Sequence, residues 1–284
     1  MVEDGMSFAL PHDRCQVMGI LNVTPDSFSD GGRYVQPRQA IAQGLRLIDE
    51  GADILDIGGE STRPGAASVP VQEEMDRVLP VIEALARETD TPLSVDTSNP
   101  EVMRAAVAVG ARLINDVRAL RMPGALEAAA ATGVPVCLMH MRGEPRTMQA
   151  SPCYGPDVVG EVMVFLAERI AACEAVGIDR TRLWIDPGFG FGKDLTHNLA
   201  LLAQLDRLRL LQCPVVVGLS RKSMLGQMLG GNAVSERLPA SLAGALWAAA
   251  RGAAVVRVHD VRATVDALRI WHVLASERAA RADA

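Results

Sequence analysis

The sequence has few aromatic residues and no excess of positive charge. It contains 3 Trp, 2 Tyr and 5 Phe among 284 residues, and its 34 acidic side chains outnumber its 28 Lys and Arg, for a formal net charge of −6. Proteins that bind nucleic acids usually carry a basic surface, and those that bind single strands add aromatic stacking platforms. The composition therefore predicts no nucleic-acid partner, although a small anionic ligand would need only a few local cations.

The sequence also lacks a long apolar segment and closely spaced cysteines. The longest stretch without a charged residue, 128–141, has 14 residues, whereas a membrane helix needs about 20. Residues 1–5 include two acids, unlike the basic start of a signal peptide. No two of the five cysteines lie within ten residues of each other, which excludes a CxxC metal site and favours reduced thiols. We therefore expect a cytoplasmic protein without a membrane segment.

Short apolar runs alternate along the chain with longer segments of helical spacing. The starts of the first and last runs, Val17 and Val255, lie 238 residues apart across seven intervals, or about 34 residues per unit, the size of a βα unit. Most runs are rich in β-branched residues and lack polar alternation, which is typical of parallel strands buried on both faces. The eight runs are 17–23, 54–57, 93–95, 113–114, 134–139, 183–185, 215–219 and 255–258.

This pattern predicts an α/β fold, a (β/α)8 TIM barrel in a single domain over residues 1–284 with a core of about 16–275. Asn99, Pro100 and Glu101 form an expected helix start, with a capping residue, a proline and an acid. An open doubly wound sheet is the alternative, but the turn after the first run, 22–26, lacks the GxGxxG pattern of a dinucleotide-binding fold. We expect the tail, 276–284, to fray.

The active site of such a barrel lies at the C-terminal ends of its strands, and all eight runs end in polar or charged residues. Asp96, Asn115, Asp186 and Lys222 together offer both hydrogen-bond donors and acceptors. Carboxylates accept from a guanidine-like edge, and an amide matches a mixed edge. The set therefore predicts a site for a flat, nitrogen-rich heterocycle.

A second set of polar residues favours an anion site. Arg257 and His259 are two positions apart on one strand, so their side chains share a face. With Arg63 and the amide of Asn22, which can ligate a hard cation, they suit a diphosphate with Mg²⁺. Two polar loops, 24–32 and 60–66, follow the first two runs and are predicted to act as mobile lids over the barrel mouth.

At these positions the sequence resembles the dihydropteroate synthases, a family of pterin-binding enzymes. The most specific motifs are GILNVTPDSFSDGG at 19–32 and DIGGESTRPG at 56–65. Shorter matches are SVDT at 94–97, INDV at 114–117, HMRG at 140–143, DPGFGFGK at 186–193, GLSRKS at 218–223 and RVHDV at 257–261. The resemblance spans roughly residues 16–275.

The resemblance implies an enzyme of folate biosynthesis that joins 6-hydroxymethyl-7,8-dihydropterin diphosphate to 4-aminobenzoate, with Mg²⁺ as cofactor. Its products would be 7,8-dihydropteroate and diphosphate. The residues that would hold the pterin diphosphate are Thr62, Asp96, Asn115, Asp186, Lys222, Arg257, Val258 and His259. Those that would surround 4-aminobenzoate are Phe28, Arg63, Pro64, Phe191 and Ser223. Catalytic roles would fall to Asn22, as the Mg²⁺ ligand, and to Arg257, His259 and Lys222.

The expected mechanism is a dissociative displacement. Mg²⁺, Arg257 and His259 would stabilise the charge that develops on the departing diphosphate. The electron-rich dihydropterin can delocalise a cation at its exocyclic methylene, and the loops would keep water from it.

Three alternatives remain beside this interpretation. A corrinoid-linked pterin methyltransferase would share the barrel but has no diphosphate to expel. A Schiff-base aldolase would use Lys222, but Arg221 and Ser223 flank that lysine and are not the apolar neighbours it needs. A non-catalytic paralogue would lose the loop motifs, which are intact here. The apolar segments 240–250 and 265–274 are expected to pair two copies as a homodimer.

Overall fold

The fold is built on eight parallel strands that circle a common axis. The computed structural model describes residues 10, 14–24, 35–61, 69–143, 148 and 152–282. The strands form one sheet in the order β6-β5-β4-β3-β2-β1-β8-β7, and a parallel bridge between Ile185 and Val215 joins its two edges. The strands are β1 (Gln16–Asn22), β2 (Ile54–Gly58), β3 (Leu93–Asp96), β4 (Leu113–Asp116), β5 (Val136–Met139), β6 (Leu183–Asp186), β7 (Val216–Val217) and β8 (Val255–Val258). The predicted TIM barrel is therefore confirmed, in a nearly closed form.

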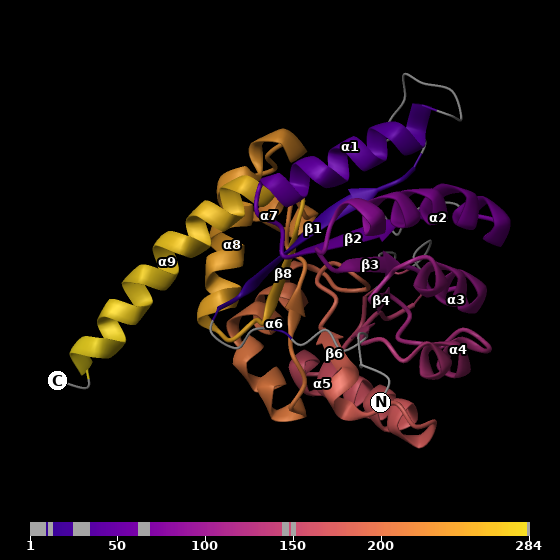
Figure 1. Cartoon of the computed structure of the whole chain (residues 1–284). Coiled ribbons are helices and arrows are strands. Elements are labelled where there is room, and N and C mark those ends of the chain that lie inside the picture. Colours follow the sequence, from indigo (N-terminus) through magenta and orange to yellow (C-terminus); the bar gives the residue numbers. More distant parts are fainter. Residues whose placement is uncertain are drawn as a thin grey trace.

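Helices surround the strands (Figure 1). They are α1 (Val35–Asp49), α2 (Val71–Glu88), α3 (Pro100–Ala108), α4 (Ala125–Thr132), α5 (Val158–Ala175), α6 (Leu195–Ala203), α7 (Ser223–Met228), α8 (Leu238–Ala250) and α9 (Val261–Ala282). Short 3-10 turns cover Arg180–Arg182, Leu205–Leu211 and Val234–Glu236. The C-terminal helix α9 begins against the barrel and extends beyond it (Figure 1).

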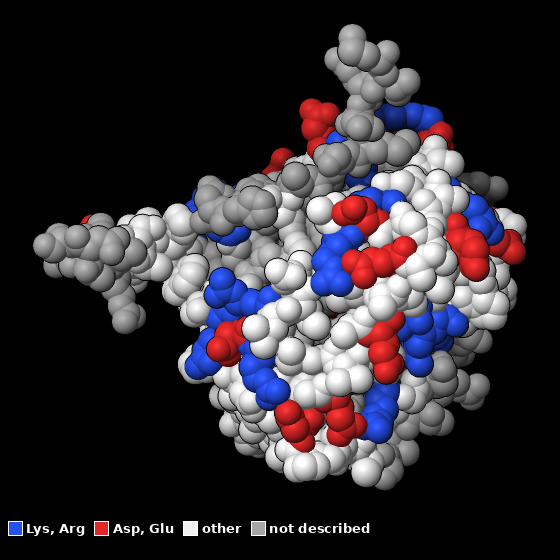
Figure 2. Space-filling view, turned by 90° about the horizontal axis from the view of Figure 1, so that it is seen from below, with Lys and Arg blue, Asp and Glu red and all other residues white. Residues whose placement is uncertain are grey.

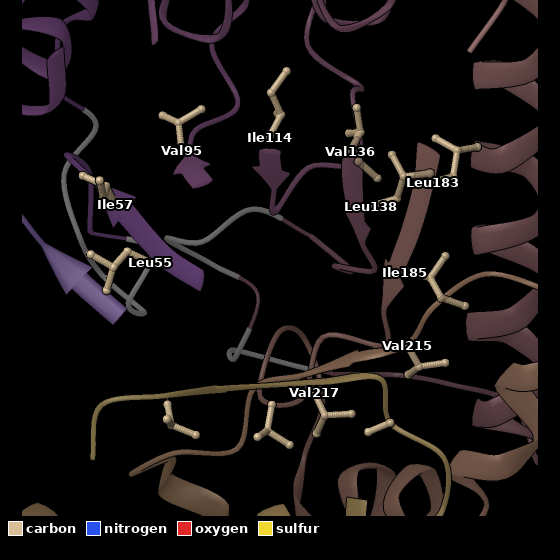
Figure 3. Close-up of a cluster of buried hydrophobic side chains, with 14 of the residues drawn as sticks. Leu55, Ile57, Val95, Ile114, Val136, Leu138, Leu183, Ile185, Val215 and Val217 are labelled. Atoms are coloured by element: carbon tan, nitrogen blue, oxygen red, sulfur yellow. The ribbon is translucent and has the colours of Figure 1, made fainter. Parts of the chain in front are cut away.

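The outward faces of the strands form the main hydrophobic core. Side chains alternate between the two faces of a strand, and Figure 3 shows the labelled Leu and Ile side chains, with their Val neighbours, pointing away from the ring of strands. Leu55 and Ile57 of β2, for example, are fully buried in this cluster. Burial of the apolar strand faces against the helices drives the closure of the barrel.

The inward faces of the strands begin with an apolar layer. Its members come from seven of the strands, with Leu10 packed beside them, and they form a hydrophobic cluster separate from the outer one. They are Leu10, Met18, Ile54, Leu113, Cys137, Trp184, Val216 and Val255. The barrel interior is therefore filled at this level, and a ligand can enter only above it.

Local sequence signals appear as expected, with two strands shorter than their apolar runs. Asn99 caps α3, because its side-chain oxygen accepts from the backbone N–H of Glu101 at 2.9 Å. The run 134–139 becomes a strand only at Val136, because Pro135 has no N–H to donate. The run 215–219 is a strand only over Val216–Val217, since the chain then turns and the N–H of Lys222 bonds the carbonyl of Leu219.

Surface charges on the visible face of the barrel are mixed in sign. In Figure 2, Lys and Arg side chains are interspersed with Asp and Glu. Many such charges form exposed pairs, among them Arg142 with Glu161 and Arg262 with Asp266. Over the described residues, none of the helices combines the length and the apolar character required to span a bilayer.

Candidate active site

A polar layer lies directly above the apolar interior of the barrel. Four of its members lie two residues after an inward apolar side chain of the lower layer, and Asp96 lies two residues after Ser94. They occupy the middle or the C-terminal part of their strands. Strand register brings the second, third and fourth strands into line, because Gly58 pairs with Asp96 and Asp96 with Asn115. The charged and amide members are Asp56, Asp96, Asn115, Asp186 and Arg257.

Arg257 is the centre of a buried ion network. Its Nε donates to Asp56 Oδ2 at 2.6 Å, and its Nη2 donates to Asp96 Oδ2 at 2.8 Å. The amide of Asn115 donates to the same oxygen of Asp56 at 3.0 Å. Asp56 is fully buried, and Asp96 is 8% exposed. One cation therefore holds two carboxylates, from β2 and β3, across the barrel.

This network sets the protonation of its members. Burial raises the pKa of Asp96 to about 7, while Arg257 acts in the opposite direction and Asp56 adds to the rise. Burial disfavours the charge of Arg257, but Asp56 and Asp96 outweigh it and raise the pKa of the guanidinium above its ordinary value. Within the described residues, Arg257 Nη1 makes no hydrogen bond, so one edge of the guanidinium remains available.

Lys222 and Asp186 form a second charged group beside the first. Burial lowers the pKa of Lys222 to about 8, although Asp186 works against the decrease. Burial raises the pKa of Asp186, while Lys222 lowers it. The amine of Lys222 donates to the carbonyl of Phe189 and lies 4.8 Å from the centre of the Phe191 ring. Lys222 thus links a carboxylate of the barrel interior to an aromatic side chain at the mouth.

The backbone just before Lys222 has an unusual conformation. Arg221 has a φ of 58°, in the left-handed region that non-glycine residues seldom adopt. Its side chain turns outward, where Nε donates to Asp260 Oδ2 at 3.0 Å. This bend separates two consecutive cations, one bonded at the surface and one at the barrel mouth.

His259 is fixed in orientation by Ser220. The hydroxyl of Ser220 accepts from the backbone N–H of His259 at 3.1 Å and lies 3.0 Å from His259 Nδ1. A hydroxyl oxygen has two lone pairs and one proton, so it can donate to Nδ1 or accept from it, depending on the tautomer of the ring. With either tautomer, Ser220 sets the orientation of the imidazole at the strand end.

Asn22 ends β1 at the mouth and is partly exposed. Its side-chain amide has no hydrogen-bond partner among the described residues, so its oxygen is open to a ligand. The described part of the chain contains no cluster of three or more His, Cys, Asp or Glu that would hold a metal by itself.

The structure separates the predicted site residues into three groups. The first group lies in the upper interior and consists of Asp96, Asn115, Asp186, Lys222 and Arg257. In the second group, Asn22 is the last residue of β1 and His259 directly follows β8. No hydrogen bond joins Arg257 to Asn22 or His259 in the described structure, because the guanidinium points across to β2 and β3. Phe28, Thr62, Arg63 and Pro64 lie outside the described residues.

Three other predicted residues occupy less central positions. The side chain of Val258 belongs to the outer hydrophobic core, on the face opposite to Arg257, so only its backbone faces the interior. Phe191 is half-buried and packs against a small cluster that includes Met139 and Met141. Ser223 is the first residue of α7.

Two residues of the site had no role assigned from the sequence. They are Asp56 and Ser220, which hold Arg257 and His259 in place. The signal for Asp56 is its spacing: it lies two residues after the inward Ile54, so it shares that inward face. For Ser220 the sequence offers no comparable signal, since its contact with His259 joins residues 39 positions apart.

Comparisons with known proteins agree over nearly the whole chain. Residues 18–259 match the family of pterin binding enzymes. The chain is 55% identical to the dihydropteroate synthase of Escherichia coli (strain K12) over 266 residues, which cover 94% of this chain and 93% of that protein. The structure of Xanthomonas albilineans dihydropteroate synthase with 4-aminobenzoic acid aligns with a TM-score of 0.87 at 59% identity, over 92% of this chain and 93% of that one. The Xanthomonas albilineans enzyme in complex with 7,8-dihydropteroate aligns with a TM-score of 0.86 at 55% identity, over 95% and 96% of the two chains.

The buried network predicts a large effect of Asp56 on stability. Asp56→Ala should lower the free energy of unfolding by about 3–5 kcal/mol, because it leaves Arg257 buried with half of its compensating charge. Urea unfolding at neutral pH measures the change. Asp266→Ala, which breaks an exposed pair on α9, is the matched control and should have a much smaller effect. If the two variants lost the same free energy of unfolding, the buried ion pair would contribute no more to stability than the exposed pair.

Proposed function

The chain belongs to the pterin binding enzyme family as a dihydropteroate synthase, a transferase of folate biosynthesis, and we propose that the polar layer of its barrel binds both substrates. These are 6-hydroxymethyl-7,8-dihydropterin diphosphate and 4-aminobenzoate. The observation that carries this proposal is the arrangement of buried carboxylates around Arg257. It offers acceptors for a guanidine-like ring edge and, beside them, a guanidinium edge for an anion.

The pterin ring occupies the upper interior of the barrel. Asp96, Asn115 and Asp186 are each 5–8% exposed, so their hydrogen bonds to the ring would be shielded from water. Without a ligand, Asp96 accepts a hydrogen bond from Arg257. When the pterin binds, N–H groups of its ring replace that hydrogen bond or share the carboxylate with Arg257. Asp186 is oriented by the backbone N–H of Gly188 at 2.7 Å.

The diphosphate lies between the strand ends of β8 and β1. Arg257 Nη1 and the imidazole of His259 are groups of the kind that bind phosphoryl oxygens. Thr62, outside the described residues, is a further candidate. Val258 contributes through its backbone, since its side chain faces outward.

The 4-aminobenzoate lies against the mouth-facing side of the site. Phe191 and Lys222 stack at 4.8 Å and form one wall, and Ser223 with the start of α7 lies next in the chain, where its backbone N–H groups favour the carboxylate. Phe28, Arg63 and Pro64 close over this subsite in our proposal.

Mg²⁺ fits this site as an ion that arrives with the diphosphate. Asn22 offers one hard oxygen without a partner in the described structure, and no larger ligand cluster is present there. Mg²⁺ is commonly held by few protein ligands with substrate phosphates and water completing its coordination. When bound, it would neutralise charge on the diphosphate oxygens.

The reaction forms a C–N bond between the amine and the exocyclic methylene, breaks the C–O bond to diphosphate and releases one proton from the amine nitrogen. The aromatic amine is neutral at pH 7, so no base is needed before it attacks. Arg257 and His259 stabilise the negative charge that the leaving diphosphate gains. The buried carboxylates hold the electron-rich ring that spreads the developing positive charge, which favours a dissociative path.

We further propose that the protein acts as a cytoplasmic homodimer. Ile270, Val273 and Leu274 form one stripe on α9, and each is 65% exposed. An apolar stripe of this kind fits a second copy of the chain. The five cysteines are unpaired, as expected for a reducing compartment.

A coupled assay of diphosphate release tests the proposed function. The purified chain, given dihydropterin diphosphate and Mg²⁺, should release diphosphate rapidly only when 4-aminobenzoate is added, because the amine is the acceptor. The product should be 7,8-dihydropteroate by mass. Release that does not depend on the amine would indicate a hydrolase, and no release would contradict the proposal.

Arg257→Ala tests the leaving-group role. We expect kcat/KM to fall by about 10²-fold or more, a typical loss for a charge-stabilising donor. Calorimetry should show that the variant loses more affinity for the pterin diphosphate than for plain 6-hydroxymethylpterin. Equal weakening of both ligands would instead assign Arg257 to the ring, and unchanged affinity for both would make it purely structural.

The pH dependence follows from Asp96 and Lys222. Asp96, with a pKa of about 7, is ionised above that pH and can then accept from the ring, whereas Lys222, with a pKa of about 8, is charged below it. Thus kcat/KM for the pterin diphosphate should rise through about pH 7 and fall through about pH 8. Lys222→Arg keeps its charge, so the descending limb should move to higher pH while the ascending limb stays. A profile that does not respond to this substitution would assign the limb to another group.

A further inference from the structure

The chain uses lysine at only two positions. Of its 28 cationic side chains, 26 are Arg and the other two are Lys193 and Lys222. Both amines bond the same segment, residues 187–194 between β6 and α6, which we call the glycine loop. The Lys222 contact belongs to the site described above, but Lys193 touches none of the groups assigned to a substrate except the backbone of Phe191.

The glycine loop is packed backbone to backbone against the segment that follows β5. Gly188 and Gly192 have φ values of 67° and 66°, in the left-handed region. A Cβ atom would lie 1.9 Å from the carbonyl oxygen of His140 at the first and 2.2 Å from that of Arg142 at the second. Only glycine permits this approach, so the loop has little room to adopt another path.

Lys193 belongs to this loop, and its side chain folds back to polar partners within the loop and at His140. Its Nζ lies 2.8 Å from His140 Nδ1, 2.9 Å from the carbonyl of Gly188 and 3.2 Å from the carbonyl of Phe191. Lys193 is 2% exposed and His140 is 4% exposed. Burial, together with Lys193, lowers the pKa of His140 to about 2, so the imidazole is a neutral acceptor. Burial lowers the pKa of Lys193 well below its usual range, while Asp186 opposes the decrease. Three polar partners around one nitrogen match a compact amine, which a planar guanidinium cannot replace.

The two lysines hold the glycine loop at neighbouring carbonyls. Lys193 bonds Gly188 and Phe191, and Lys222 bonds Phe189 and lies over the Phe191 ring. The position of the Phe191 ring therefore depends on both amines. Asp186 contacts the loop at one point, where its Oδ1 accepts from the N–H of Gly188 at 2.7 Å.

We propose that Lys193, with His140 as its acceptor, is a positioning residue that shapes the 4-aminobenzoate subsite by fixing the backbone of Phe191. The inference rests on the proposed function, because it takes Phe191 as a wall of that subsite. It assigns Lys193 no contact with substrate.

A matched control exists at the opposite end of the same two strands. Arg182 precedes β6 and donates to the carbonyl of Val134, just before β5, through Nη2 at 2.8 Å. It connects the same strand pair from the face of the barrel remote from the site. Loss of Arg182 should therefore lower stability without affecting the subsite.

The test compares Lys193→Met with Arg182→Met in the full-length chain. Lys193→Met keeps the length of the side chain and removes the amine with its three contacts. We expect KM for 4-aminobenzoate to rise about tenfold or more, the effect of losing a buried hydrogen bond, while Kd for 6-hydroxymethylpterin changes less than about twofold. Arg182→Met should leave both values unchanged while Tm falls. Unchanged KM in Lys193→Met, or a joint rise of KM and Kd, would overturn the proposal.

A second pair of variants tests the same contact if Lys193→Met fails to fold. His140→Asn places an amide oxygen near the position of Nδ1, and His140→Leu removes the acceptor. KM for 4-aminobenzoate should rise in His140→Leu and return toward the wild-type value in His140→Asn. Equal KM values in the two would overturn the proposal. Failure of the proposed function is distinguishable, because the wild-type chain would then show no release of diphosphate that depends on 4-aminobenzoate.

Discussion

The contact of Arg257 with Asp56 and Asp96 is the interaction on which the rest of the site depends. Two carboxylates so close together inside a barrel would repel each other and resist ionisation without a cation between them. Arg257 supplies that cation from β8, and Asp56 also accepts from Asn115. The network therefore fixes the distance between three strands. The pKa of Asp96 is about 7, so its carboxyl ionises and becomes a full acceptor near neutral pH.

The strands and the polar rim could be predicted because both follow local rules. Apolar runs without alternation indicate buried parallel strands, and the topology collects their ends at one face. The same period-two rule that placed Arg257 inside should have placed Val258 outside, where the structure has it. The partner of Arg257 could not be predicted. It lies 201 residues away, and the rotamer that sends the guanidinium across the barrel, instead of up toward His259, depends on charges that meet only in three dimensions.

The polar layer is possible because other parts of the barrel supply the stability. The outward strand faces and the lower interior are apolar and almost fully buried. Four buried side-chain atoms lack partners within the described residues: Asp56 Oδ1, Glu74 Oε1, Ser94 Oγ and Tyr154 Oη. Such atoms each cost free energy. Asp56 Oδ1 belongs to the polar layer, where a ligand would add hydrogen bonds.

The two halves of the site are joined by Lys222. Its amine interacts with Asp186, an acceptor for the heterocycle, and also with the carbonyl of Phe189 and the ring of Phe191. An ammonium with three separate donors can satisfy partners in several directions at once, whereas Arg257 presents a flat fork to two carboxylates. Each cation thus matches the geometry of its partners. Asp186 and Phe191 share Lys222 and also share the glycine loop. In the site that we propose, the group that accepts from the heterocycle and the ring that borders 4-aminobenzoate are therefore connected through this lysine and the loop.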